Sequence, residues 1–148
     1  IKTTHQELNR RFSISNPNIW VSGLNPHAGE NGTIGDEEQK FIIPIIKKLQ
    51  SEGYNLLGPL SADTMFYGKK RPCFDAAICM YHDQALIPIK TLDFHSSVNL
   101  TIGLSFIRTS PDHGTAFDIA GKNLANPTST IEAIKLAWNM AKKEQKDR

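Results

Sequence analysis

Cysteine, net charge and long apolar runs are all scarce in this sequence. The 148 residues include two cysteines, Cys73 and Cys79, too few for a disulfide framework or a structural zinc site. The net charge of +2 gives no strong field that would favour nucleic acid as a partner. No apolar run approaches the about 20 residues of a membrane-spanning helix, and no basic-then-apolar signal pattern begins the chain. We therefore expect a cytoplasmic protein with no nucleic-acid or membrane partner.

A glycine-rich nucleotide motif is absent too. The pattern G-x-G-x-x-G occurs nowhere in the chain, so a Rossmann-type site has no support from motifs. The hydrophobic content of 39% and charged content of 22% are those of a globular domain with a real core. Because the chain begins with Ile1 inside an apparent helical pattern, we expect it to be a piece of a longer protein.

Apolar periodicity and turn residues predict alternating helices and strands. Helices are expected over residues 1–12, 36–52, 84–90 and from Asn126 onward, and strands over 19–22, 75–79, 98–102 and 105–108. This alternation is typical of an α/β fold. In the second helix we expect a capping box of Asp36 and Gln39 and a bend at Pro44; in the third, an interruption at Pro88. The expected inner face of the second helix consists of Phe41, Ile42, Ile45, Ile46 and Leu49.

Histidines follow two of the short apolar segments. His27 lies in the loop after the strand at 19–22, and His82 comes directly after the strand at 75–79. Open α/β sheets bind ligands at the carboxyl ends of their strands, so two imidazoles there could begin a divalent-metal site. A carboxylate from Glu30, Asp63 or Asp83 could complete it. Helix capping is the alternative interpretation for both aspartates.

Basic and amide side chains stand at the edges of later apolar segments. They are Lys90, Asn99 and Arg108. A guanidinium at a strand end costs free energy unless an anion meets it. The residues leave two interpretations open for Arg108: a phosphate or carboxylate ligand, or an internal salt bridge. Composition alone indicates a surface loop over residues 113–121.

Taken in order, five motifs resemble the 4-hydroxythreonine-4-phosphate dehydrogenase family of pyridoxal-phosphate biosynthesis. The resemblance covers essentially the whole chain but only the carboxyl-terminal part of that family. The motifs are Gly23-Leu24-Asn25-Pro26-His27-Ala28-Gly29-Glu30, Ala62-Asp63-Thr64, Met80-Tyr81-His82-Asp83-Gln84, Phe106-Ile107-Arg108-Thr109-Ser110 and Asp112-His113-Gly114-Thr115-Ala116. Residues 113–127 also look like the adenosine-binding loop of the wider isocitrate and isopropylmalate dehydrogenase fold.

The resemblance implies the carboxyl-terminal part of a two-lobed α/β fold of that wider group, acting as a homodimer with its site at the subunit interface. Residues 1–90 would belong to the metal-binding and dimerisation lobe, and residues 91–148 to the cofactor-binding lobe. His27 and His82 match two of the family's three metal-binding histidines, and the third belongs to sequence that precedes Ile1 in the family. The metal would be zinc, cobalt or magnesium.

Further roles are also implied residue by residue. Asp63 and Asp83 match catalytic carboxylates near the metal, and Lys90, Asn99 and Arg108 match substrate-binding positions. The matches to the cofactor loop, which would bind NAD, are His113, Gly114, Thr115, Ala116, Asp118 and Asn126. An aspartate beside the adenosine ribose would favour NAD over NADP, because its charge repels a 2′-phosphate.

The implied reaction is NAD-dependent oxidation and decarboxylation of 4-phosphooxy-L-threonine to 3-amino-2-oxopropyl phosphate. Two alternative functions are compatible with the same residues. The protein could be a related dehydrogenase acting on another phosphorylated or carboxylated hydroxy acid, or a non-catalytic fragment that binds metal or dimerises. We expect the 148 residues by themselves to be inactive, because one of the family's three histidines is missing from them.

Overall fold

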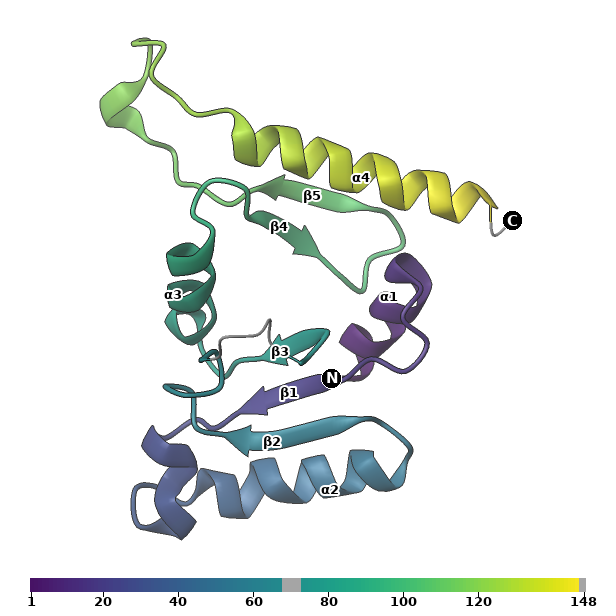
Figure 1. The fold of residues 1–148 in the computed structure, drawn as a ribbon, viewed down its shortest axis with the longest axis vertical. Helices are drawn as coiled ribbons and strands as arrows, with labels where there is room; N and C mark the ends of the chain where they lie inside the picture. Colours follow the sequence, from purple (N-terminus) through teal and green to yellow (C-terminus); the bar gives the residue numbers. More distant parts are fainter. Residues whose placement is uncertain (68–72, 147–148) are drawn as a thin grey trace. The chain divides into compact units, whose positions relative to one another are not determined.

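The computed structural model describes residues 1–67 and 73–146. The chain forms two compact units, Ile1–Pro88 and Ile89–Arg148, which are described one at a time (Figure 1). The roles expected for the two parts, metal binding and dimerisation before residue 90 and cofactor binding after it, stay predictions. No helix among the described residues is both long enough and apolar enough to cross a bilayer.

A three-stranded parallel sheet forms the centre of the first unit. Its strands are β1 (Ile19–Ser22), β2 (Leu56–Leu60) and β3 (Ala76–Ile78), in the order β2-β1-β3. Ile19 and Val21 of the middle strand, which point to the same face of the sheet, are fully buried. The predictions of strands at 19–22 and 75–79 and of an α/β fold are therefore confirmed.

Strand β2 passes very close to β1 at Gly58. A Cβ atom built on Gly58 would lie 2.4 Å from the carbonyl oxygen of Val21, so no residue with a side chain fits there. Because β2 is an edge strand, it also tolerates the proline that follows. The Gly-Pro pair hides this strand from a search for apolar runs.

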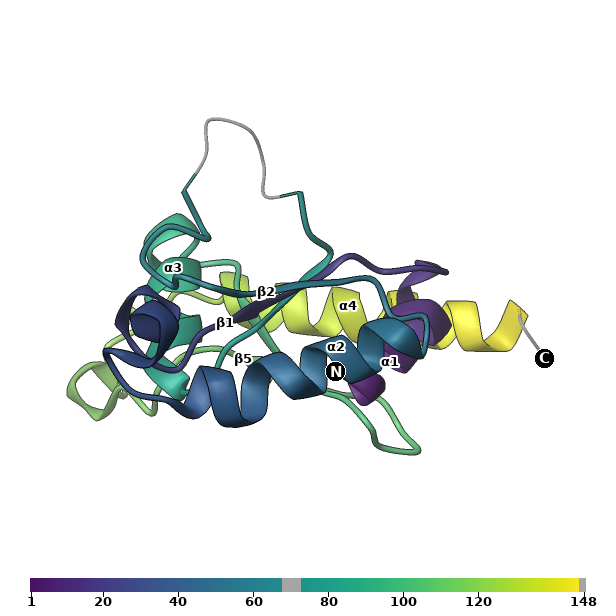
Figure 2. The same cartoon turned by 90° about the horizontal axis from the view of Figure 1, so that it is seen from below.

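The helix expected over residues 36–52 consists of two parts. A π-helical turn, η2 (Glu38–Ile42), leads into α2 (Ile43–Ser51), which packs against the sheet (Figure 2). Pro44 stands where the two parts join, in the first turn of α2, and the bend expected there stays a prediction. The expected capping box is wrong, since the Asp36 carboxylate instead pairs with Lys40 Nζ at 2.5 Å.

The expected inner face of this helix is only partly correct. Ile46 and Leu49 are buried and Ile42 packs against the same cluster, but Phe41 and Ile45 are 59% and 52% exposed. Ile42, Ile46 and Leu49 recur at the i, i+4, i+7 spacing of one helical face. Phe41 and Ile45 lie beside that face, where the sheet does not cover them.

Helices at each end of the first unit also match their predictions approximately. Helix α1 (Lys2–Phe12) occupies the expected first segment and buries the ion pair of Glu7 and Arg11. Helix α3 (His82–Leu92) begins two residues earlier than expected. The expected interruption is wrong, because α3 continues through Pro88; a proline can be accommodated in a helix as a kink with one backbone bond lost.

The second unit is a β-hairpin covered by a helix. Strands β4 (Val98–Thr101) and β5 (Arg108–Pro111) are antiparallel, and α4 (Thr128–Lys146) packs against them. The strand expected at 105–108 is misplaced, because pairing of Thr101 with Arg108 starts the ladder at Arg108. A short turn of 3-10 helix, η3 (Phe117–Ile119), precedes α4.

Candidate active site

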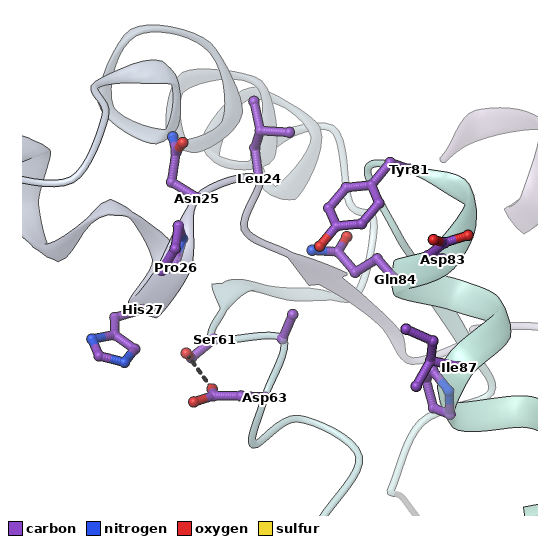
Figure 3. Close-up of a pocket in the computed structure, with 12 residues that line it drawn as sticks. Leu24, Asn25, Pro26, His27, Ser61, Asp63, Tyr81, Asp83, Gln84 and Ile87 are labelled. Atoms are coloured by element: carbon purple, nitrogen blue, oxygen red, sulfur yellow. Dashed lines mark hydrogen bonds between the residues drawn. The ribbon is translucent and has the colours of Figure 1, made fainter. Parts of the chain in front are cut away.

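A pocket of about 360 Å³ lies at the carboxyl ends of the three parallel strands (Figure 3). Because parallel strands end at the same edge of a sheet, the segments that follow them meet there. The volume is within the range of small-molecule sites. The lining side chains come from after β1 (Leu24, Asn25, Pro26, His27), after β2 (Ser61, Ala62, Asp63) and from after β3 into α3 (Tyr81, Asp83, Gln84, Ile87, Pro88).

The loop that carries His27 has an unusual backbone. Within η1 (Pro26–Gly32), His27, Ala28, Glu30 and Asn31 all have positive φ, between 41° and 58°. Non-glycine residues rarely adopt this left-handed conformation, and each costs of order 1 kcal/mol. Such strain persists only where surrounding contacts fix it, and it concentrates at functional sites.

The His27 imidazole is oriented by a neighbour on the same turn. Its Nδ1 lies 2.7 Å from Glu30 Oε1, and this hydrogen bond and the charge of Glu30 raise the pKa of His27. With Nδ1 engaged by a carboxylate, Nε2 is the ring nitrogen left for a ligand, which is the usual arrangement of a metal-binding histidine. Glu30 therefore orients the His27 ring, and its carboxylate is engaged by that hydrogen bond.

Asp63 faces the same pocket from the turn after β2. Its Oδ1 accepts a hydrogen bond of 2.6 Å from Ser61 Oγ (Figure 3). That bond lowers the pKa of Asp63, and the positive charge of His27 lowers it further. The helix-cap interpretation of Asp63 is wrong, since residues 62–66 form turns without a helix.

Asp83 lines the pocket from the first turn of α3. It is not the residue before the helix, as a cap would be, because the helix already begins at His82. Tyr81 and Asp83 both line the pocket, whereas His82 between them is not among the lining residues. The convergence of His27 and His82 on one ion stays a prediction.

Gln84 is a pocket residue that belongs to one of the five motifs but has no role predicted from the sequence. It is only 7% exposed. Its Oε1 accepts from Ser22 Oγ at 2.5 Å and from the Met80 backbone N–H at 2.7 Å, and its Nε2 donates to the Gly23 carbonyl at 2.8 Å. Gln84 therefore joins the ends of β1 and β3, from which the two histidine segments leave.

The residues fit a divalent ion in part. Imidazole and carboxylate donors suit zinc or cobalt, and magnesium less well. His27 has its second nitrogen held as in known sites, and carboxylates share its pocket. In residues 1–67 and 73–146, however, no group of three or more histidine, cysteine, aspartate or glutamate side chains lies close enough together to hold a metal ion.

The predicted substrate-binding residues lie in the second unit. Lys90 Nζ donates to the Asp112 carbonyl at 2.6 Å and pairs with its Oδ2 at 3.1 Å. Asn99 is exposed on β4. Arg108 is exposed on β5, donates from Nη1 to Thr101 Oγ1 at 2.7 Å, and forms no ion pair within the part of the chain that the structure describes. Lys90 therefore forms an internal salt bridge, with Asp112, whereas Arg108 forms none with the described residues.

The predicted cofactor residues form an exposed segment before α4. The side chains of His113, Thr115, Ala116 and Asp118 are exposed, and Ala116 has a positive φ of 47° where η3 begins. Asn126 accepts hydrogen bonds through Oδ1 from the Thr128 N–H at 2.9 Å and the Thr128 hydroxyl at 2.6 Å. Asn126 therefore orders the start of α4, a role that does not test cofactor binding.

The fold and the pocket together define an α/β protein with a pocket of polar and apolar side chains at the carboxyl edge of a parallel sheet. The sequence model described as "Pyridoxal phosphate biosynthetic protein PdxA" matches residues 1–137. The chain therefore belongs to the PdxA family, as its motifs predicted.

Relatives support this assignment over most of the chain. A 4-hydroxythreonine-4-phosphate dehydrogenase of Roseobacter denitrificans is 66% identical over 141 residues, which are 95% of this chain and 43% of that protein. A crystal structure of the Klebsiella pneumoniae 4-hydroxythreonine-4-phosphate dehydrogenase superposes with a TM-score of 0.82 at 44% identity, covering 95% of this chain and 42% of that one. The chain thus spans less than half the length of these relatives.

One similar structure has a different name. The terephthalate 1,2-cis-dihydrodiol dehydrogenase of Burkholderia xenovorans LB400 has a TM-score of 0.71 and 36% identity, over 93% of this chain and 43% of that one. The same architecture therefore occurs in dehydrogenases named for different substrates.

Proposed function

We propose that the protein carrying this chain is an NAD-dependent dehydrogenase that oxidises and decarboxylates 4-phosphooxy-L-threonine to 3-amino-2-oxopropyl phosphate. One observation carries the proposal. A single pocket gathers residues of three family motifs, His27, Asp63 and Asp83, from the ends of three parallel strands. The family membership and the names of the relatives supply the substrate.

In this proposal His27 and His82 contribute two ligands of a divalent ion. The remaining ligand would come from sequence that the longer relatives possess and this chain does not contain. When bound, the ion would lower the pKa of the substrate hydroxyl and stabilise the negative charge that develops on decarboxylation. The Glu30 carboxylate, which engages Nδ1 of His27, would leave Nε2 to bind the ion.

A pocket carboxylate would take the proton of the substrate hydroxyl while the hydrogen on the same carbon passes to NAD as hydride. Asp63 and Asp83 are the two candidates. The hydrogen bond from Ser61 lowers the pKa of Asp63, which keeps this carboxylate ionised at neutral pH but also makes it a weaker base. Loss of carbon dioxide from the resulting keto acid then gives the amino ketone.

Lys90, Asn99 and Arg108 would bind the phosphate and carboxylate groups of the substrate. Arg108 is the best suited, because its guanidinium is exposed and bonded only to a hydroxyl among the described residues. Lys90 would have to exchange its bonds with Asp112 for an anion. The cofactor NAD would bind the exposed segment of His113 to Asp118, with Asp118 at the ribose, and the protein would act as a homodimer.

The direct test measures NADH formation by the full-length protein with 4-phosphooxy-L-threonine, before and after removal of metal by a chelator. We expect turnover that chelation abolishes and that zinc or cobalt restores. His27→Ala should lose both turnover and stoichiometric metal, whereas Lys47→Ala, on the exposed side of α2, should retain both. The isolated 148 residues should be inactive; robust turnover by them, or none by the full-length protein, would contradict the proposal.

Another dehydrogenase substrate is the second candidate. The similarity to the dihydrodiol dehydrogenase favours it, because that protein shares the fold at 36% identity. A panel of phosphorylated and carboxylated hydroxy acids, compared by kcat/KM, separates the two candidates. A full-length protein that retains no stoichiometric ion and turns over none of them would instead be a non-catalytic member.

A further inference from the structure

A buried carboxylate lies beneath the loop that carries His27. Glu38, in the first turn of η2, is only 1% exposed. Its Oε1 accepts from the Leu24 and Asn25 backbone N–H groups, both at 2.7 Å, and its Oε2 accepts from Asn25 Nδ2 at 2.9 Å. Burial alone would raise the pKa of Glu38, but these bonds outweigh burial and lower it. The Glu38 carboxylate is therefore held by hydrogen bonds to the loop residues Leu24 and Asn25 and is buried away from solvent.

The loop is moulded around this carboxylate. A Cβ atom on Gly23 would lie 3.0 Å from Glu38 Oε1, and one on Gly29 would lie 2.7 Å from Oε2. A Cβ on Gly35 would lie 2.4 Å from Asn25 Nδ2. The glycines of this segment therefore allow the backbone to approach the Glu38–Asn25 pair, and they do not simply confer flexibility.

The position of this carboxylate relates it directly to His27. Leu24 and Asn25 immediately precede the left-handed turn, and Gly29 lies within it. A run of strained residues keeps one conformation only when neighbouring contacts determine it. The carboxylate fixes the backbone on the side where the turn begins, so it determines where the His27 ring is presented to the pocket.

We infer that Glu38 is a positioning residue, which sets the His27 imidazole for ligand binding through the backbone of Leu24 and Asn25. The inference rests on the proposed function, in which His27 is a metal ligand. Glu38 does not line the pocket and would touch neither metal nor substrate. Nothing in the sequence pattern singles it out from the other carboxylates in residues 30–38.

The sharpest perturbation is Glu38→Gln in the full-length protein. The glutamine carbonyl can still accept from Leu24 and Asn25, but its NH₂ group faces the Asn25 NH₂ group, so two donors oppose each other. We expect the affinity for Zn²⁺ or Co²⁺ to fall about 10- to 100-fold, as it does when an outer partner of a metal ligand is lost. The matched control is Asp36→Asn, which removes an exposed carboxylate two residues away and should leave the affinity unchanged.

Rescue separates positioning from a general contribution to folding. Asn25 Nδ2 also donates to Glu37 Oε2 at 2.6 Å, so the rescue variant changes all three residues. With Asn25→Asp, Glu37→Gln and Glu38→Gln together, donor and acceptor exchange places at both contacts, and the metal affinity should recover by at least about threefold over Glu38→Gln. If Glu38→Gln does not fold, Asn25→Ala takes its place, and a drop of about threefold or more is expected. Glu37→Gln is measured beside Asn25→Ala, because Asn25→Ala opens the bond to Glu37 as well as one of the three bonds to Glu38. Melting temperatures are recorded for every variant beside the metal titrations.

Unchanged metal affinity in folded Glu38→Gln, or in Asn25→Ala, would overturn the inference, even if the melting temperature fell. So would a wild-type protein that binds neither ion. The proposed function is judged separately by NADH formation. Metal binding that depends on Glu38 in a protein inactive on 4-phosphooxy-L-threonine would retain the inference and reject the proposed substrate.

Discussion

Replacing Gln84 with methionine should destabilise the protein far more than its position next to a pocket suggests. Methionine has nearly the length and volume of glutamine, so the change removes hydrogen bonds and leaves little cavity. Three groups lose their bond to Gln84: the Ser22 hydroxyl, the Met80 N–H and the Gly23 carbonyl. A buried polar group without a partner costs about 1–3 kcal/mol.

The total follows from how buried each group is. Gly23 is buried and its carbonyl should bear the whole cost, whereas the Ser22 hydroxyl, also buried, still has the Cys79 thiol as a hydrogen-bond partner and Met80 is only half-buried. We therefore expect a loss of about 3 kcal/mol in the free energy of unfolding. Gln50→Met is the control, because Gln50 is exposed and makes one bond, to the Leu56 carbonyl at 3.0 Å. It should cost about 1 kcal/mol or less.

Urea unfolding of the full-length protein measures both variants, and a double-mutant cycle tests the cause. Ser22→Ala should destabilise the wild type, but it should cost less in the Gln84→Met background, because the hydroxyl has already lost its bond to Gln84 there. Equal costs for Gln84→Met and Gln50→Met, or an additive cycle, would refute the account of Gln84 as the joint between β1 and β3.

Three further predictions concern the first unit, each measured by unfolding of the full-length protein. The pKa of Glu38 is lowered in the folded state, so its contribution to stability should be present above its ordinary value of 4.5 and be lost as the pH falls through the folded-state pKa; a Glu38→Gln variant with the same acid profile as wild type would contradict this. Gly35→Ala should lower the free energy of unfolding by about 2 kcal/mol or more, since the new Cβ would overlap Asn25. Gly53 also has positive φ, but nothing lies within 4 Å of a new Cβ there, so Gly53→Ala should lower it by only about 1 kcal/mol. Similar values for both variants would show that the overlap with Asn25 is relieved. Ile46→Ala should cost about 2–5 kcal/mol because Ile46 is 2% exposed, and exposed Lys47→Ala should change stability by about 0.5 kcal/mol or less.

Local patterns in the sequence were sufficient for most elements. The strand at Ile19–Ser22 and the helices at either end follow from short-range apolar periodicity, and the family follows from motifs. The predictions fail where a residue distant in the sequence determines the local structure. Strand β5 starts at Arg108 because pairing with Thr101 sets the register, and Phe41 and Ile45 stay exposed because the core covers only the adjacent helix face.

The candidate site divides in the same way. The sequence by itself determined that histidines and aspartates follow strands, because a change from apolar to polar residues is a local signal. Only the tertiary structure decided that Asp63 faces the pocket of His27, that Glu30 holds its ring, and that Glu38 and Gln84 fix the surrounding backbone. The physical reason is that hydrogen bonds of a buried polar group depend on which segments fold against it, and residue type alone does not specify them.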